Sequence, residues 1–171
     1  MADIYIGIDP DNEKSGVGIV YKQTKQVKTD KMSFWRLFGF LQELKRTHDK
    51  EQYKIIIEAG WLIKSNWHVL GNYMNTAKAA AMGRSVGMNH QTGILIHDMC
   101  KSLDLPVVLQ PPLRKYWKAK DGKISQQELE MVVGTDKLPR MNQDQRDALL
   151  LAWVCADLPV RVRTKNSKKQ D

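Results

Sequence analysis

The sequence predicts an α/β fold in which a mixed five-stranded sheet has helices on both faces. Three observations support this: short β-branched runs bounded by turn residues, stretches between them with apolar positions at the helical period, and an element order of βββαβαβαα. The first three strands are expected within residues 1–32 as an antiparallel meander. Residues 4–8 form a β-branched run that Asp9-Pro10 ends, and residues 16–21 and 26–32 follow after polar turns.

The middle of the chain predicts two helices and two further strands. Ser33 is a candidate cap for a helix whose leucines follow the 3.6-residue period, and residues 55–57 form a buried strand. Residues 75–103 begin with small side chains and continue with larger apolar ones, which predicts a long helix with an interruption near Gly93. Residues 106–109 then predict the fifth strand, which a pair of prolines ends.

Two helices close the predicted fold. Ser125 and Glu128 have the spacing of a capping box, which opens a short helix that Gly134 ends. Asn142 to Gln145 opens the last helix, which runs through an apolar stretch to Leu158-Pro159.

Composition limits the class of protein. The 171 residues include 27 Lys and Arg against 19 Asp and Glu, a net charge of +8 with a pI near 9.5. We expect one domain over residues 1–160 and a basic, disordered tail over residues 161–171. Two distant cysteines, no long apolar stretch and no basic leader predict a cytoplasmic protein without a membrane segment. The cationic surplus favours a polyanionic partner such as nucleic acid.

Four carboxylates occupy positions that indicate chemistry. Asp9 and Glu58 end two strands, and Asp144 and Asp147 lie three apart on the last helix. If the first and fourth strands are neighbours, all four can converge, and their repulsion would be relieved by oxygen-preferring cations. Two Mg²⁺ ions, or Mn²⁺ in their place, would then support phosphodiester hydrolysis. The alternative is structural: Asp9 starts a turn, and the two helix acids favour the helix dipole.

These residues resemble the motifs of a known family, the RuvC-type Holliday junction resolvases of the ribonuclease H-like superfamily. The resemblance covers residues 4–156. It is carried by Asp9-Pro10-x-x-x-x-Ser15-Gly16-x-Gly18, by Ile56-Ile57-Glu58 and by Asp144-Gln145-Arg146-Asp147-Ala148-Leu149. It implies a ribonuclease H-like fold and a homodimeric crossover junction endodeoxyribonuclease that cuts branched DNA. It also implies that the four acids are catalytic residues and ligands of two Mg²⁺ ions. Asp11 departs from the family glycine and is expected to alter metal affinity or support the ligands.

Further residues are assigned by looser similarity or by charge. Lys123 precedes a segment similar to a family motif and would stabilise charge on the scissile phosphate, or else is an ordinary exposed lysine. Trp61 resembles an aromatic that contacts unstacked bases, or else packs in a core or dimer interface. Lys64 lies in the loop after Glu58. The expected DNA-binding residues are Trp61, Lys64, Arg114, Lys115, Lys118 and Lys120. The dimer contact is expected in the helix around residues 77–88.

Three other functions remain open from the sequence. The first strand and turn also resemble the phosphate loop of actin and sugar-kinase folds, although 171 residues leave no room for the second loop. A catalytically silent junction-binding module would have no reason to keep four uncompensated acids. A nuclease of the same fold acting on flaps or RNA·DNA hybrids cannot be separated from the leading hypothesis by sequence.

Overall fold

The computed structural model describes residues 2–63, 75–114, 116–135 and 137–160. Five strands form one mixed sheet, as predicted, in the order β3-β2-β1-β4-β5. Strands β1, β2 and β3 are the expected antiparallel meander, and β1 is parallel to β4, which is parallel to β5. The strands are β1 (Ile4–Asp9), β2 (Ser15–Tyr21), β3 (Gln26–Met32), β4 (Tyr53–Glu58) and β5 (Val107–Gln110).

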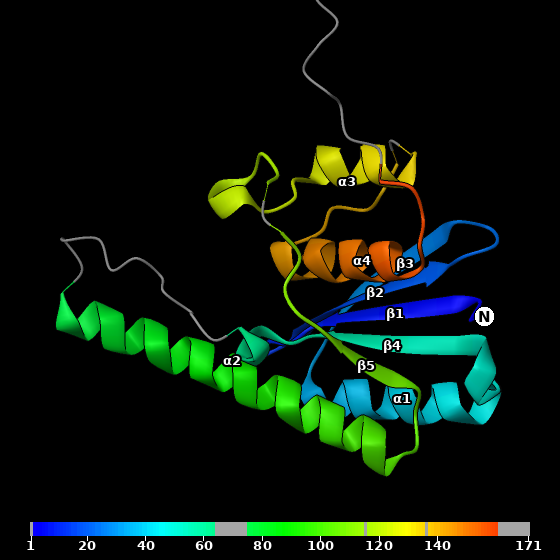
Figure 1. The fold of residues 1–171 in the computed structure, drawn as a ribbon, viewed down its shortest axis with the longest axis horizontal. Coiled ribbons are helices and arrows are strands. Elements are labelled where there is room, and N and C mark those ends of the chain that lie inside the picture. The colour runs from blue at the N-terminus through cyan, green and yellow to red at the C-terminus, as the bar shows by residue number, and fades with distance from the viewer. Residues whose placement is uncertain (1, 64–74, 115, 136, 161–171) are drawn as a thin grey trace, which may run out of the picture.

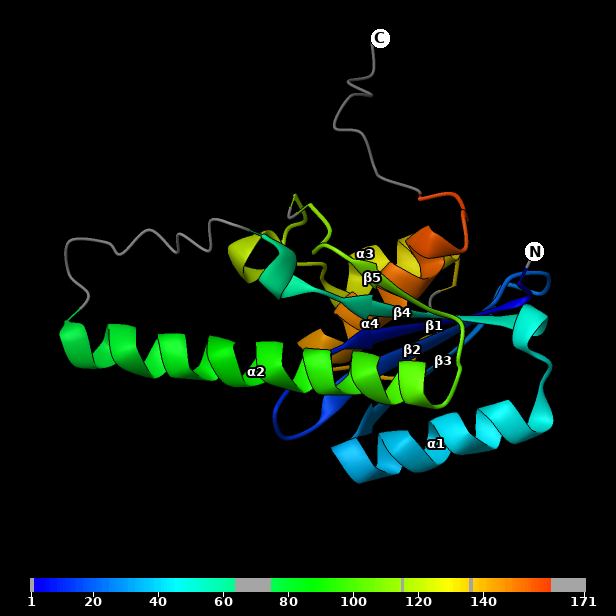
Figure 2. The ribbon, with the colours of Figure 1, turned by 60° about the horizontal axis from the view of Figure 1, so that its bottom comes forward.

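The two faces of the sheet are covered by different helices (Figure 1). Helix α1 (Phe34–Thr47) and the long helix α2 (Thr76–Ser102) lie on one face, and α4 (Gln143–Cys155) crosses the other. Helix α3 (Gln126–Val133) packs outside α4. The turned view in Figure 2 shows that the first half of α2 extends well beyond the sheet. No helix in the described ranges is long and apolar enough to cross a membrane.

Local sequence signals set most helix ends. The predicted capping box at Ser125 is present, and Gly134 ends α3 with a left-handed φ of 83°. A second capping box, at Asn142, opens α4. The predicted interruption of α2 at Gly93 is wrong, because the helix is continuous there. This glycine leaves room for the ring of Trp61, which a Cβ would strike. Helix α4 ends at Cys155, before the predicted Leu158-Pro159.

The face toward α1 and α2 is filled by large side chains. Branched residues of β1, β2 and β4 meet leucines of α1, and Ile96 and Cys100 of α2 complete the layer. These side chains are almost wholly removed from water, which supplies the main stabilisation of this half. The buried members are Ile4, Ile6, Ile8, Val17, Met32, Leu37, Leu41, Leu44, Tyr53, Ile55, Ile57, Ile96, Cys100 and Leu105.

The face toward α4 is built differently, with three strand glycines beneath the helix. Gly7 of β1 and Gly18 of β2 are register partners, and Gly16 of β2 pairs with Asp9. A Cβ at Gly7 would strike the Ala148 carbonyl, and one at Gly18 would strike the Leu149 backbone. At these three glycines the backbone of α4 therefore rests directly on the strands, and beside them the side chains of Tyr5, Val20 and Ile56 pack against the helix.

Candidate active site

Asp9 and Glu58 lie at the same edge of the sheet. Strands β1 and β4 are parallel neighbours with Ile8 opposite Ile57, so their carboxyl ends coincide. Side chains two apart along a strand share a face. Asp9 follows Gly7 on the α4 face, and Glu58 follows Ile56, which packs in the core beneath α4. The parallel pairing thus brings together two acids that are 49 positions apart in the sequence.

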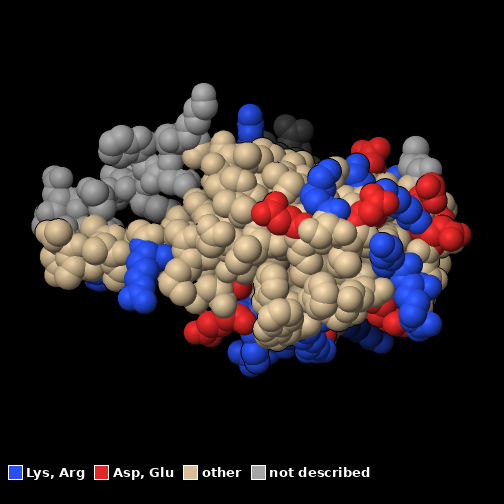
Figure 3. All heavy atoms as spheres, turned by 90° about the horizontal axis from the view of Figure 1, so that it is seen from below, with Lys and Arg blue, Asp and Glu red and all other residues tan. Residues whose placement is uncertain are grey.

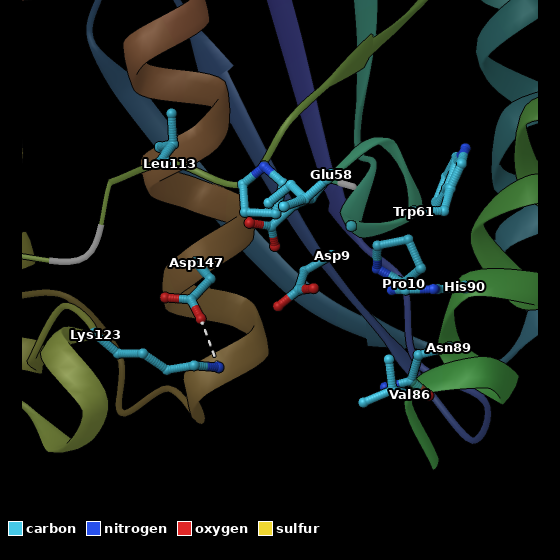
Figure 4. Close-up of a pocket in the computed structure, with 13 residues that line it drawn as sticks. Asp9, Pro10, Glu58, Trp61, Val86, Asn89, His90, Leu113, Lys123 and Asp147 are labelled. Atoms are coloured by element: carbon cyan, nitrogen blue, oxygen red, sulfur yellow. Dashed lines mark ion pairs between the residues drawn. The ribbon is translucent and has the colours of Figure 1, made fainter. Parts of the chain in front are cut away.

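A pocket of about 460 Å³ opens at this edge. Asp9, Glu58, Asp147 and Lys123 line one part of it, and Figure 4 shows these side chains directed toward a common space. They come from β1, β4, α4 and the segment before α3. The pocket therefore assembles four predicted site residues from four separate parts of the chain.

The glycine contacts fix the position of the two helix acids. Asp144 is in the first turn of α4, and its backbone lies so close to Gly16 that a Cβ there would strike it. Since Gly16 is the register partner of Asp9, this contact sets where α4 begins relative to Asp9. Asp147 follows three positions later, near the Ala148 contact with Gly7.

Asp9 is in an electrostatic setting that disfavours its charged form. Burial raises the pKa of Asp9 well above its usual range, and the charges of Glu58, Asp147 and Asp144 raise it further. Lys123 acts in the opposite direction. All three predicted partner acids therefore lie near enough to Asp9 to affect its ionisation.

Lys123 is held against Asp147. Its Nζ lies 3.2 Å from Asp147 Oδ2, and Gln143 Nε2 donates to Asp147 Oδ1 at 2.7 Å. The carbonyl of Ile124, next to Lys123, accepts from Gln143 and from Arg146 Nε. Burial alone would lower the pKa of Lys123, but the charges of Asp147, Asp9 and Glu58 raise it overall. Lys123 is thus a charged group anchored inside the pocket.

Asp144 contacts a different cation. Its Oδ2 lies 3.6 Å from Lys31 Nζ and accepts a hydrogen bond from Asn142 Nδ2 at 3.0 Å. The two acids of α4 therefore each face their own lysine. Asp144 is not among the residues that line the pocket.

The acidic side chains of the site carry the type of oxygen ligand that a divalent cation prefers. Carboxylate oxygens are the ligands that Mg²⁺ and Mn²⁺ prefer, and the raised pKa of Asp9 indicates clustered anions that a cation would stabilise. Across the described ranges, however, no three His, Cys, Asp or Glu side chains are arranged closely enough to hold a metal. The residues fit Mg²⁺ chemically, and side-chain rotation would be needed to close a cage around it.

Asp11 organises the turn between β1 and β2. Its Oδ1 accepts hydrogen bonds from the amides of Glu13 and Lys14, and its Oδ2 accepts from Asn89 of α2 at 3.4 Å. Asn89 Oδ1 in turn accepts from the Asn12 amide. In this arrangement Asp11 supports the backbone next to Asp9 and links it to α2.

The other wall of the pocket is aromatic and comes partly from α2. Trp61 and Pro10 both lie against Gly93 of α2, and the Trp61 ring meets His90 edge-on at 6.2 Å between centroids (Figure 4). Trp61 is half-buried in this wall, so both expected roles, packing and base contact, remain compatible with its place. His90 and Asn89 also line the pocket.

The expected basic surface is present in part. Arg114, Lys118 and Lys120 are exposed on the segment that leads to Lys123. The stacked rings of Tyr116 and Trp117 lie between them, 4.9 Å apart. Lys64 and Lys115 fall outside the described residues, as does the basic tail over residues 161–171.

Sequence reasoning missed several residues at this site. Lys31, Gln143 and His90 were not singled out, although each lies near a predicted residue or in the pocket wall. Lys31 had no local signal, because the observed register of β2 with β3 is what places it beside Gly16. Gln143 lies one helical turn before Asp147, a spacing at which side chains meet. His90 had no local signal, since only the packing of α2 brings it to the pocket.

Comparison with solved structures finds several similar chains. T. thermophilus RuvC in complex with Holliday junction substrate is similar over 87% of this chain and 89% of that chain, with 17% identity and a TM-score of 0.49. No protein-family model matches the chain, and no curated protein matches it. The chain's own mixed five-stranded sheet with helices on both faces is the α/β architecture predicted from the sequence.

Proposed function

We propose that this protein is a divalent-metal-dependent endonuclease that resolves four-way DNA junctions by paired, symmetric nicks. The observation that carries the proposal is the shared pocket of Asp9, Glu58, Asp147 and Lys123 at the carboxyl ends of β1 and β4. Anionic oxygens beside an anchored lysine, on a chain of net charge +8, suit the hydrolysis of a phosphodiester.

The proposal assigns a role to each residue of the site. Asp9, Glu58, Asp147 and Asp144 would hold Mg²⁺ or Mn²⁺, which supplies an activated water and stabilises the leaving 3′ oxygen. Lys123 would stabilise the charge that develops on the scissile phosphate. Gln143 keeps Asp147 oriented, because its amide donates to that carboxylate. The product would carry a 5′ phosphate.

The choice of a four-way junction rests on the three sequence motifs. Such a junction has near two-fold symmetry and needs two symmetric nicks, so a homodimer with two equivalent sites matches it. Trp61 and the basic residues Arg114, Lys118 and Lys120 would contact the DNA, with Lys64 and Lys115 as further contacts. We place the whole activity in residues 1–160.

Helix α2 is the proposed dimer contact. Its first half, around residues 77–88, is mostly exposed and carries small side chains together with Met82 and Met88, which are 38% and 41% exposed. Figure 3 shows this projecting end as mostly uncharged atoms, with Lys or Arg atoms on it and no Asp or Glu atoms. Small residues permit close approach of a second helix, so two copies of α2 are suited to pack together.

The test is a nicking assay on a labelled four-way junction beside linear duplex, flap and RNA·DNA hybrid, with Mg²⁺ and with Ca²⁺. We expect cutting of the junction with Mg²⁺ only. Asp147→Asn removes a charge from the pocket and should lower the cutting rate by about a hundredfold or more while junction binding is retained.

The matched control is Asp157→Asn, the same charge change just beyond the other end of α4, where Asp157 is exposed. This variant should cut like the unchanged protein. Normal cutting by Asp147→Asn would disprove the assigned role. Preferential cutting of flap or hybrid would redirect the substrate to another nucleic acid, and junction binding without cutting in any metal would indicate a silent module.

A further inference from the structure

Lys31 is a cation at the edge of the candidate site for which the sequence motifs provide no role. It lies one residue before the end of β3, opposite Gly16 of β2. Gly16 lies directly under the backbone of Asp144. The side chain of Lys31 therefore meets the first turn of α4, where its Nζ is 3.6 Å from Asp144 Oδ2.

The groups around Lys31 define its possible partners. The neighbouring Asp30 is held by Arg36, with 2.6 Å between Arg36 Nη2 and Asp30 Oδ2. Arg36 also donates to the Lys31 carbonyl, which fixes the backbone at this point. Asp144 is thus the acid that the Lys31 ammonium meets across the sheet, and each of the two is partly exposed.

Asp144 and Asp147 are alike in facing lysines and differ in what else they face. Asp147 meets Lys123 inside the pocket, beside Asp9 and Glu58. Asp144 contacts Lys31, and neither residue lines the pocket. Asn142 donates to Asp144 Oδ2, the oxygen that faces Lys31. To join Asp9 around a cation, the Asp144 carboxylate would have to leave Lys31. An ammonium and a divalent ion would compete for the same charge.

We propose that Lys31 is a positioning residue that competes with the divalent cation for Asp144. In the metal-free protein the Lys31 ammonium pairs with the Asp144 carboxylate. This ion pair breaks when a divalent cation binds, so Lys31 weakens cation binding at the Asp144 side of the site. The inference rests on the proposed function, because it assumes that the four acids bind the metal. It adds a residue that sets the concentration of divalent cation at which the site fills.

The experiment measures Mn²⁺ binding to the DNA-free protein by electron paramagnetic resonance, in which bound Mn²⁺ loses the signal of the free ion. Lys31→Met removes the ammonium and keeps the length of the side chain. We expect it to tighten Mn²⁺ binding by about fivefold, the effect of removing one partly exposed ion pair with Asp144.

The matched control is Lys28→Met, the same change on the same strand. Lys28 Nζ lies 5.6 Å from the centre of the Tyr21 ring, at a position opposite Ile19 instead of Gly16. This variant should bind Mn²⁺ like the unchanged protein. In an Asp144→Asn background, Lys31→Met should have no further effect, because the carboxylate for which Lys31 and the cation compete is gone.

The outcomes separate this inference from the proposed function. If the unchanged protein binds Mn²⁺ and Asp147→Asn weakens that binding, but Lys31→Met behaves like Lys28→Met, only the role of Lys31 is wrong. The same holds if the gain persists in the Asp144→Asn background. If the unchanged protein binds no Mn²⁺, the metal site and the role of Lys31 are both overturned.

Discussion

The two faces of the sheet are packed by different means. Toward α1 and α2, isoleucines and leucines interlock in a layer of side chains. Toward α4, the glycines at 7, 16 and 18 let helix backbone touch strand backbone. A layer of side chains adjusts when one of them changes, whereas two backbones in contact cannot. The acids of the candidate site belong to the second face, where position is fixed most tightly.

The largest test of this contrast is Gly18→Val. The Cβ alone would strike the backbone of Leu149, so α4 cannot dock without moving. We expect a loss of about 4 kcal/mol or more in the free energy of unfolding, measured by urea denaturation. Gly39→Ala in α1 is the control, because nothing lies within 4 Å of its Cβ position. It should stabilise the protein by about 0.5–1 kcal/mol. A Gly18→Val protein as stable as the unchanged one would refute the backbone contact.

An intermediate effect is expected from Leu41→Ala on the other face. Leu41 is fully buried between α1 and the sheet, and its truncation leaves a cavity. The free energy of unfolding should fall by about 3 kcal/mol. Mn²⁺ affinity should stay unchanged, because the site lies on the opposite face. A large change in Mn²⁺ affinity would show that the two faces are not independent.

The smallest effect is expected from Glu128→Gln, which loosens the segment that carries Lys123. Glu128 accepts hydrogen bonds from the Lys118 amide and from both the amide and hydroxyl of Ser125. Burial alone would raise the pKa of Glu128, but these hydrogen bonds lower it overall from its usual value of 4.5. The variant should lose about 1–2 kcal/mol of unfolding free energy near pH 7.

The pH dependence of this loss follows from the direction of the shift. A carboxyl with a lowered pKa stabilises the folded state above its unfolded pKa, and this contribution disappears as pH falls through the folded pKa. The difference between the Glu128→Gln and unchanged proteins should therefore shrink as pH drops below 4.5. Thermal melting between pH 7 and pH 3 measures it. A difference that stays constant over this range would contradict the assigned charge.

Local signals were sufficient to predict the elements of the fold. Turn residues, capping boxes and apolar periods located the five strands and four α-helices of the described residues to within a few positions, because these signals act between neighbours in the chain. The short 3-10 helices were not predicted. The error at Gly93 has a tertiary cause. The glycine suggested a break, but it is required by the Trp61 ring from a distant segment.

The site was predictable in its residue types but less so in its geometry. Strand ends and helical spacing pointed to Asp9, Glu58 and Asp147, which do line a common pocket with Lys123. The pairing of Asp144 with Lys31 depends on how β3 lies beside α4, which the sequence does not encode locally. The role of these residues in metal binding and catalysis stays a prediction.

The amide of Asn89 joins the turn after Asp9 to α2. Helix α2 has 27 residues, and an α-helix of that length is about 40 Å long. Such a rod is stiff along its axis, so a push on its projecting end is transmitted to its other parts. Asn89 lies where α2 passes the edge of the sheet, and its hydrogen bonds connect the helix to the turn after Asp9. A partner that bound the free end of α2 would therefore be connected through Asn89 to the turn beside Asp9.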